Sequence, residues 1–150
     1  MKKALIATLI LFSLSASFLF AQQEEEVRQV IASMFEGMKS KNTDLIKAAF
    51  HPEAIMQTVK SGENGAELDS NSVMDFVNRI ASSPATTTLD ERILDYQIKV
   101  DGDMAAAWTP YEFYVNENFS HCGVNSFQLI RTKEGWKITY IIDTRRKEGC

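Results

Sequence analysis

The sequence predicts an α+β domain in which a curved antiparallel sheet wraps around three N-terminal helices. One observation is the order of patterns, because helical spacing comes first and long strand-like segments follow from residue 86 onward. The second is a terminal hairpin, in which β-rich segments 124–131 and 136–144 flank a turn at residues 133–135. A long, strongly twisted sheet curls into a cone, which leaves a pocket between the sheet and the first helix.

Three segments have the pattern of helices. The first carries apolar side chains at the i, i+3, i+4, i+7 spacing of one helical face, from Val27 to Met38. The second ends before Pro52, because the residue that precedes a proline avoids helical geometry. The expected helices are 24–39, 43–50 and 72–81, with a short strand at 54–59 and a loop at 61–65.

The second half of the chain reads as strands separated by turns. The turns are rich in glycine, asparagine and aspartate, which suit tight connections between strands. The expected strands are 88–100, 104–115, 124–131 and 136–144, with turns at 101–103, 116–118 and 133–135.

The N-terminus has the features of a secretory signal peptide. Lys2 and Lys3 precede an apolar run that ends at Phe20, and the small residue Ala21 follows. A membrane anchor is the alternative, but it needs about 20 apolar residues, and this run is shorter and contains serine and threonine. We therefore expect residues 1–21 to be removed and residues 22–150 to form a single exported domain, periplasmic or secreted.

Charge and motifs exclude several classes of function. The formal net charge is −4, and removal of the two signal-peptide lysines lowers it to −6. Nucleic-acid binding needs clustered positive charge, so we expect no nucleic-acid partner, and no membrane partner after signal removal. The sequence has no nucleophile elbow, metal-ligand cluster or phosphate-binding loop, so no metal or cofactor is expected.

The chain has two cysteines, Cys122 and Cys150. In an exported protein a disulfide between them is favoured, and the hairpin brings the two positions within reach if the tail folds back. The alternative is a buried Cys122 and a Cys150 that pairs between chains.

Three stretches of the chain have a distinctive character: FHPEA after the second helix, the aromatic strand AAAWTPYEFYV and the closing strand GWKITYIIDTRR. Together with the order of the elements, they resemble the nuclear transport factor 2-like superfamily, and most closely its exported lumazine-binding group. The resemblance implies a cystatin-like cone with a pocket, and homodimers. It implies no single chemistry, because the superfamily includes ketosteroid isomerases, dehydratases, polyketide cyclases and members without catalysis.

Candidate pocket residues follow from strand alternation. In the strand 104–115, alternation places Thr109, Tyr111 and Phe113 on the expected pocket face and Trp108 and Tyr114 on the other, where aromatic residues suit a dimer interface. Pro110 predicts a bulge or bend that would exchange the faces beyond it. The candidate ligand contacts are Tyr96, Trp108, Tyr111, His121, Asn125, Asp143 and Arg145.

The hairpin register decides which residues meet, and two registers are open. A two-residue turn sets Phe127 beside Ile142 and pools hydrophobic side chains on one face. A three-residue turn instead groups His121 and Asn125 with Asp143 and Arg145, an arrangement suited to an acid–base or anion-binding site.

The sequence favours an exported domain that binds a small apolar or aromatic ligand without converting it. The alternative is an isomerase-like or cyclase-like enzyme with Asp143 or His121 as acid–base group and a tyrosine such as Tyr111 as donor. A further alternative is a dimeric interaction module, which would have a filled cavity. A strongly raised carboxylate pKa in a dry pocket would favour the enzyme.

Overall fold

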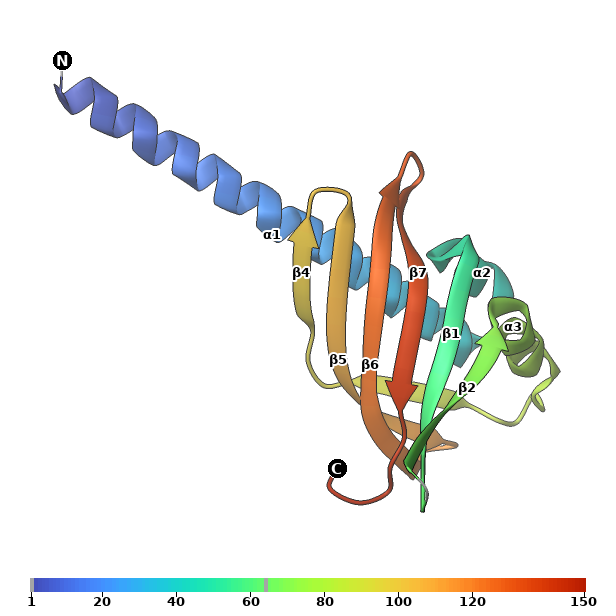
Figure 1. Ribbon diagram of the computed structural model, residues 1–150. Helices are drawn as coiled ribbons and strands as arrows, with labels where there is room; N and C mark the ends of the chain where they lie inside the picture. The colour runs from blue at the N-terminus through green and yellow to red at the C-terminus, as the bar shows by residue number, and fades with distance from the viewer. Residues whose placement is uncertain (1, 64) are drawn as a thin grey trace.

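The computed structural model describes residues 2–63 and 65–150, with side chains described from Phe20 onward. Within these residues, three helices pack against one curved sheet of seven strands, which confirms the predicted α+β class (Figure 1). The helices are α1 (Lys2–Ser40), α2 (Thr43–Ala49) and α3 (Val73–Ser82). The strands are β1 (Phe50–Gly62), β2 (Gly65–Ser72), β3 (Leu89–Ile93), β4 (Gln97–Asp101), β5 (Met104–Val115), β6 (Asn118–Thr132) and β7 (Gly135–Thr144).

The sheet is mixed, with the strand order β2-β1-β7-β6-β5-β3 and with β4 on the remaining half of β5. It differs from the expected antiparallel sheet because β1 runs parallel to β7, with Ile55 opposite Tyr140. The predicted strand 88–100 is divided into β3 and β4. The amide of Leu94, between them, donates to the carbonyl of Pro110 at 2.9 Å.

Strand β2 has no counterpart among the predicted elements. Its sequence, GAELDSNS, is polar and mostly exposed, so it lacks the β-branched and aromatic residues typical of strands. Backbone pairing with β1 holds it, from Ile55 opposite Ser72 to Gly62 opposite Gly65. The predicted loop 61–65 is therefore shorter than expected, because Ser61 and Gly62 belong to β1 and Gly65 belongs to β2.

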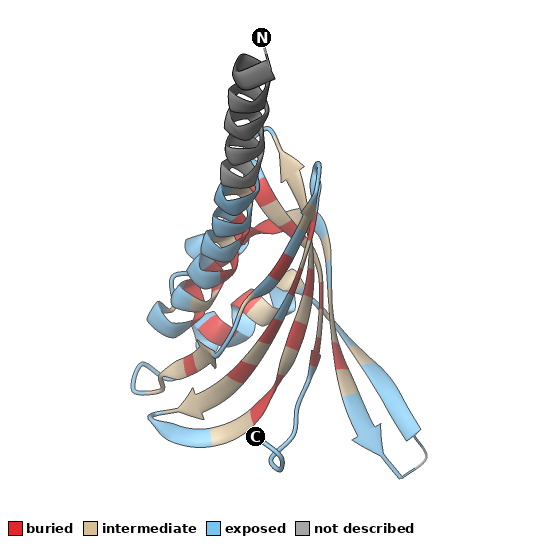
Figure 2. Cartoon of the chain, turned by 90° about the vertical axis from the view of Figure 1, so that its left-hand side faces the viewer, coloured by how far each residue is buried: buried red, intermediate tan, exposed pale blue. Residues whose placement is uncertain are grey.

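The core lies where α1 crosses the concave face of the sheet (Figures 1 and 2). The predicted apolar face of α1 is buried from Val27 to Met38, and Val27 and Ile31 are fully inaccessible. Opposite it lie the inward side chains of the strands: Ile98, Ala105, Ala107, Phe127, Leu129 and Ile138. Full burial of each large apolar side chain contributes about 1.5–3 kcal/mol.

The β6–β7 hairpin combines a tight turn with a bulge. Thr132 pairs with Gly135, whose φ of +100° favours glycine, so Lys133 and Glu134 form the loop. The register then shifts by one residue at Thr139, and from there Asn125 lies opposite Asp143. The pairing of Phe127 with Ile142 is therefore wrong. The polar grouping of the other register is present, but a bulge and not a three-residue turn produces it.

The bulge expected at Pro110 is absent. Pairing of β5 with β6 continues without a shift from Met104 to Phe113, so Thr109 and Tyr111 remain on the concave face and are buried. The irregularity lies one step later, where Phe113 faces His121 and the next residue of β5 faces Phe119. The inward face of β5 is thus the face that simple alternation predicts.

The predicted disulfide between Cys122 and Cys150 is confirmed, with the Cα atoms 5.8 Å apart. It fastens the C-terminal tail to β6, next to a backbone bridge between Cys122 and Arg146. Such a bond is typical of an oxidising compartment. The signal-peptide assignment stays a prediction, because the side chains of residues 1–19 lie outside those described. In the part of the chain that the structure describes, no helix is long and apolar enough to span a membrane.

Candidate functional site

A cavity of about 330 Å³ lies between the sheet, the last two turns of α1 and helix α3. One side of it is apolar, with contributions from both helices and five strands: Met34, Phe35, Met38, Met56, Phe76, Ile80, Leu89, Phe113, Phe127 and Ile141. The other side is polar and comes mainly from the strands: Gln57, Thr58, Asn71, Arg79, Glu91, Tyr111, His121, Asn125, Asp143 and Arg145. The arrangement can therefore hold a molecule with an apolar body and a polar edge.

The central strands position the polar groups because inward residues of adjacent strands lie side by side. Asn125 on β6 faces Thr109 on β5 and Asp143 on β7. Tyr111 lies opposite Gly123, and its hydroxyl donates to the carbonyl of Thr144 at 2.9 Å. A Cβ atom at Gly123 would lie 1.8 Å from that carbonyl oxygen, so only glycine permits this approach.

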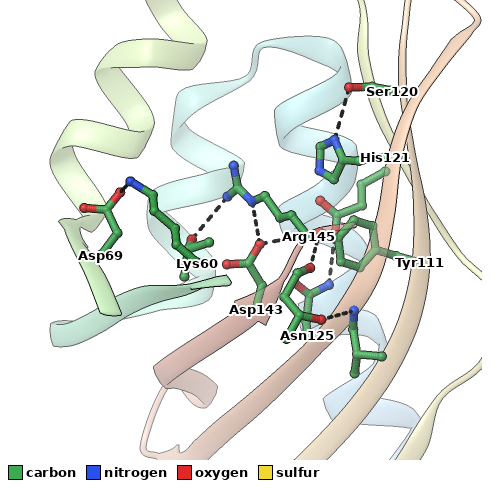
Figure 3. A network of polar contacts seen from close by, with 12 residues as sticks. Lys60, Asp69, Tyr111, Ser120, His121, Asn125, Asp143 and Arg145 are labelled. Atoms are coloured by element: carbon green, nitrogen blue, oxygen red, sulfur yellow. Dashed lines mark hydrogen bonds and ion pairs between the residues drawn. The ribbon is translucent and has the colours of Figure 1, made fainter. Parts of the chain in front are cut away.

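Asp143 and Arg145 form an ion pair at the end of β7 (Figure 3). Arg145 Nε donates to Asp143 Oδ2 at 2.8 Å, and Arg145 Nη2 lies 3.4 Å from the hydroxyl of Thr58. Burial alone would lower the pKa of Arg145, but the ion pair with Asp143 outweighs it and raises the pKa. The guanidinium therefore stays charged and neutralises the buried Asp143 carboxylate.

Glu91 on β3 belongs to the site, although sequence reasoning missed it. Asn125 Nδ2 donates to Glu91 Oε1 at 2.7 Å. Burial raises the pKa of Glu91 to about 8, and the nearby charge of Asp143 acts in the same direction. Near neutral pH the carboxyl group is therefore mostly protonated. The sequence contains a signal for this placement, because strand alternation puts Glu91 on the same face as the apolar residues Leu89 and Ile93.

The ring of His121 is held between two aromatic side chains. It stacks on Phe113 with centroids 4.8 Å apart and meets the edge of Tyr111 at 5.9 Å. Its Nδ1 lies 3.1 Å from the hydroxyl of Ser120. Burial, and then the charge of Arg145, lower the pKa of His121, while burial raises the pKa of the Tyr111 phenol. Both groups are therefore neutral near pH 7.

Five of the predicted ligand contacts line the cavity: Tyr111, His121, Asn125, Asp143 and Arg145. Trp108 does not, because it is half-exposed on the outer face of β5. Tyr96 does not either, and its ring lies under the guanidinium of Arg28, 4.5 Å from ring centroid to Cζ. Within the described residues, no group of three His, Cys, Asp or Glu side chains could hold a metal ion.

Comparison with known proteins gives a family match over most of the chain. The model of the family described as "Putative lumazine-binding" matches residues 22–140. No curated protein matches the chain.

Solved structures share the fold. A nuclear transport factor 2-like protein with a cystatin-like fold from Novosphingobium aromaticivorans is 17% identical, with 93% of this chain and 92% of that chain covered and a TM-score of 0.69. A nuclear transport factor 2-like protein of unknown function from Shewanella baltica is 16% identical over 86% and 98% of the two chains, with a TM-score of 0.64. A putative dehydratase of the same family from Streptomyces avermitilis is 16% identical over 84% and 97%, with a TM-score of 0.65. At these identities the similarity shows the fold alone.

Proposed function

The chain belongs to the putative lumazine-binding family, and on that premise we propose that it is an exported domain that binds one small, partly apolar molecule without converting it. The observation that carries the proposal is the cavity of about 330 Å³, which joins an apolar wall to a group of convergent polar side chains. Ligand sites have this composition, because apolar contact supplies affinity and a few polar groups fix the orientation. The disulfide supports the exported location.

The hydrogen bonding of the polar groups supports binding over turnover. The Tyr111 hydroxyl proton is directed to the backbone of Thr144, and Asp143 is neutralised by Arg145. Neither group is a free acid or base, since each already has a partner inside the protein. An interaction module was expected to have a filled cavity, so the open volume also favours a ligand.

The proposal is tested by measuring the mass of the purified protein under native and then denaturing conditions, with and without reductant. We expect a small molecule that leaves on unfolding. Leu89→Trp, which places a larger side chain in the cavity, should remove this molecule. Leu68→Trp should retain it, because Leu68 is exposed on β2 and does not line the cavity. A wild-type protein that carries no ligand, or a Leu89→Trp variant that keeps it, would contradict the proposal.

A specific observation supports an acid–base enzyme as the second candidate. The pKa of Glu91, about 8, is near the range in which a carboxyl group can both donate and accept a proton at physiological pH. The dehydratase name of the Streptomyces avermitilis relative is compatible with such chemistry. The recovered ligand would be incubated with wild type and with Glu91→Gln. Product formed by wild type alone would favour the enzyme, and an unchanged ligand would favour binding.

A further inference from the structure

The cavity opens into a groove between β1, β2 and α3. Arg79 on α3 and Arg145 after β7 line both the cavity and the groove, as do Thr58 and Asn71 on the two strands. The two guanidinium groups therefore lie at the mouth, where the apolar interior meets solvent.

The charges around this mouth do not cancel. Lys60 pairs with Asp69 at 2.7 Å, and Arg145 pairs with Asp143 at 2.8 Å (Figure 3). Among the described residues, Arg79 forms no ion pair. One positive charge thus remains at the mouth, although the chain as a whole has a net charge of −4.

Two further acidic groups, one on α3 and one inside the cavity, do not supply the missing partner. Asp75, one turn before Arg79, lies in the first turn of α3, and its carboxylate accepts a hydrogen bond from the hydroxyl of the N-cap residue Ser72 at 2.7 Å. Glu91 lies deeper in the cavity, bonded to Asn125, and burial raises its pKa to about 8, so it carries little charge near neutral pH. His121 is neutral there as well, because burial lowers its pKa.

We propose that the cavity takes an amphipathic organic monoanion, whose apolar body lies against Phe76, Ile80 and Phe127 and whose carboxylate lies between Arg79 and Arg145. This inference rests on the proposed ligand-binding function and names the chemical class of the ligand. A guanidinium presents several N–H donors in a planar fork that matches a carboxylate. The single uncompensated charge matches a monoanion better than a dianionic phosphate ester.

The test compares two probes with the same bicyclic body, 2-naphthoate and 2-naphthamide, by calorimetric titration. We expect wild type to bind the naphthoate at least about tenfold more tightly than the amide. A hydrogen bond to a charged group contributes a free energy of this size. Arg79→Gln should remove most of this preference and leave the affinity for the amide unchanged. Added salt should weaken the binding of the naphthoate and not that of the amide.

Lys133→Gln is the matched control, because it removes one positive charge at the turn between β6 and β7, at the other end of these strands from the cavity. It should preserve the preference for the anion. Equal affinity of wild type for the two probes would overturn the monoanion inference and leave the ligand-binding proposal intact. If neither probe binds, the result would count against the monoanion inference and against the ligand-binding proposal. An equal loss in Lys133→Gln and Arg79→Gln would assign the preference to overall charge and overturn the role of Arg79.

Discussion

The concave face of the sheet has two regions that share the same strands and differ in what covers them. Under α1 the inward positions are apolar and fully packed, as at Leu129 and Ile138. Further along the same strands the inward positions become Asn125 and Asp143, and here the helices leave a cavity. Alternation of side chains continues through both regions, so strand geometry is common to them.

The comparison indicates a division of roles between the two regions. Apolar burial under α1 stabilises the fold, whereas the burial of polar and ionisable groups such as Glu91 is unfavourable unless each finds a partner. In the cavity region these groups have partners within the protein, as Glu91 has in Asn125 and Asp143 has in Arg145. We therefore expect substitutions under α1 to lower stability, and substitutions at the cavity to lower it less or to raise it.

The largest expected effect is at Glu91, where a substitution should stabilise the protein. In the folded protein the pKa of Glu91 is about 8, above its ordinary value of 4.5. The protonated carboxyl group therefore makes its full contribution to stability below about pH 4.5. That contribution is lost as the pH rises to about 8. Glu91→Gln cannot ionise, so it should exceed wild type by on the order of 4 kcal/mol at about pH 9 and match it at about pH 4.

Urea unfolding across this pH range would measure the Glu91 effect. The control is Glu134→Gln, which removes one carboxylate from the exposed loop between β6 and β7. Parallel stability curves for wild type and Glu91→Gln would mean that Glu91 ionises normally in the folded protein.

The next prediction contrasts truncations in the two regions. Ile31→Ala in the packed region removes a fully buried side chain and should cost about 3 kcal/mol, because a new void remains. Leu89→Ala removes a side chain that already faces the cavity, so it should cost only about 1 kcal/mol. Chemical denaturation of both variants gives the two values. Equal losses would show that the cavity wall is packed as tightly as the core.

A smaller effect is expected at Gly123, where β6 lies close to the end of the adjacent strand β7. Gly123→Ala places a methyl group against the Thr144 carbonyl and should cost about 2 kcal/mol, because β7 has to move away. The same movement should weaken the hydrogen bond from Tyr111 to Thr144. Thermal unfolding measures the first effect, and the NMR signals of the Tyr111 ring report the second. Wild-type stability in this variant would contradict the close approach.

The sequence by itself determined the elements of this protein and several of their details. The spacing from Val27 to Met38 defined the buried face of α1, and alternation defined the inward face of β5. Glycine and asparagine marked the turns at residues 101–103 and 116–118, and the two cysteines predicted their own pairing. These features are local or depend on a single possible partner, so periodicity and residue chemistry suffice to identify them.

Only the tertiary structure decided how the site is assembled. The bulge at Thr139 sets Asn125 opposite Asp143, and the pairing of β3 with β5 brings Glu91 to Asn125. The parallel pairing of β1 with β7 brings Thr58 beside Arg145, while Trp108 faces outward. Strand partners and register depend on contacts between residues distant in sequence, and a shift of one residue exchanges the faces. No local pattern carries that information.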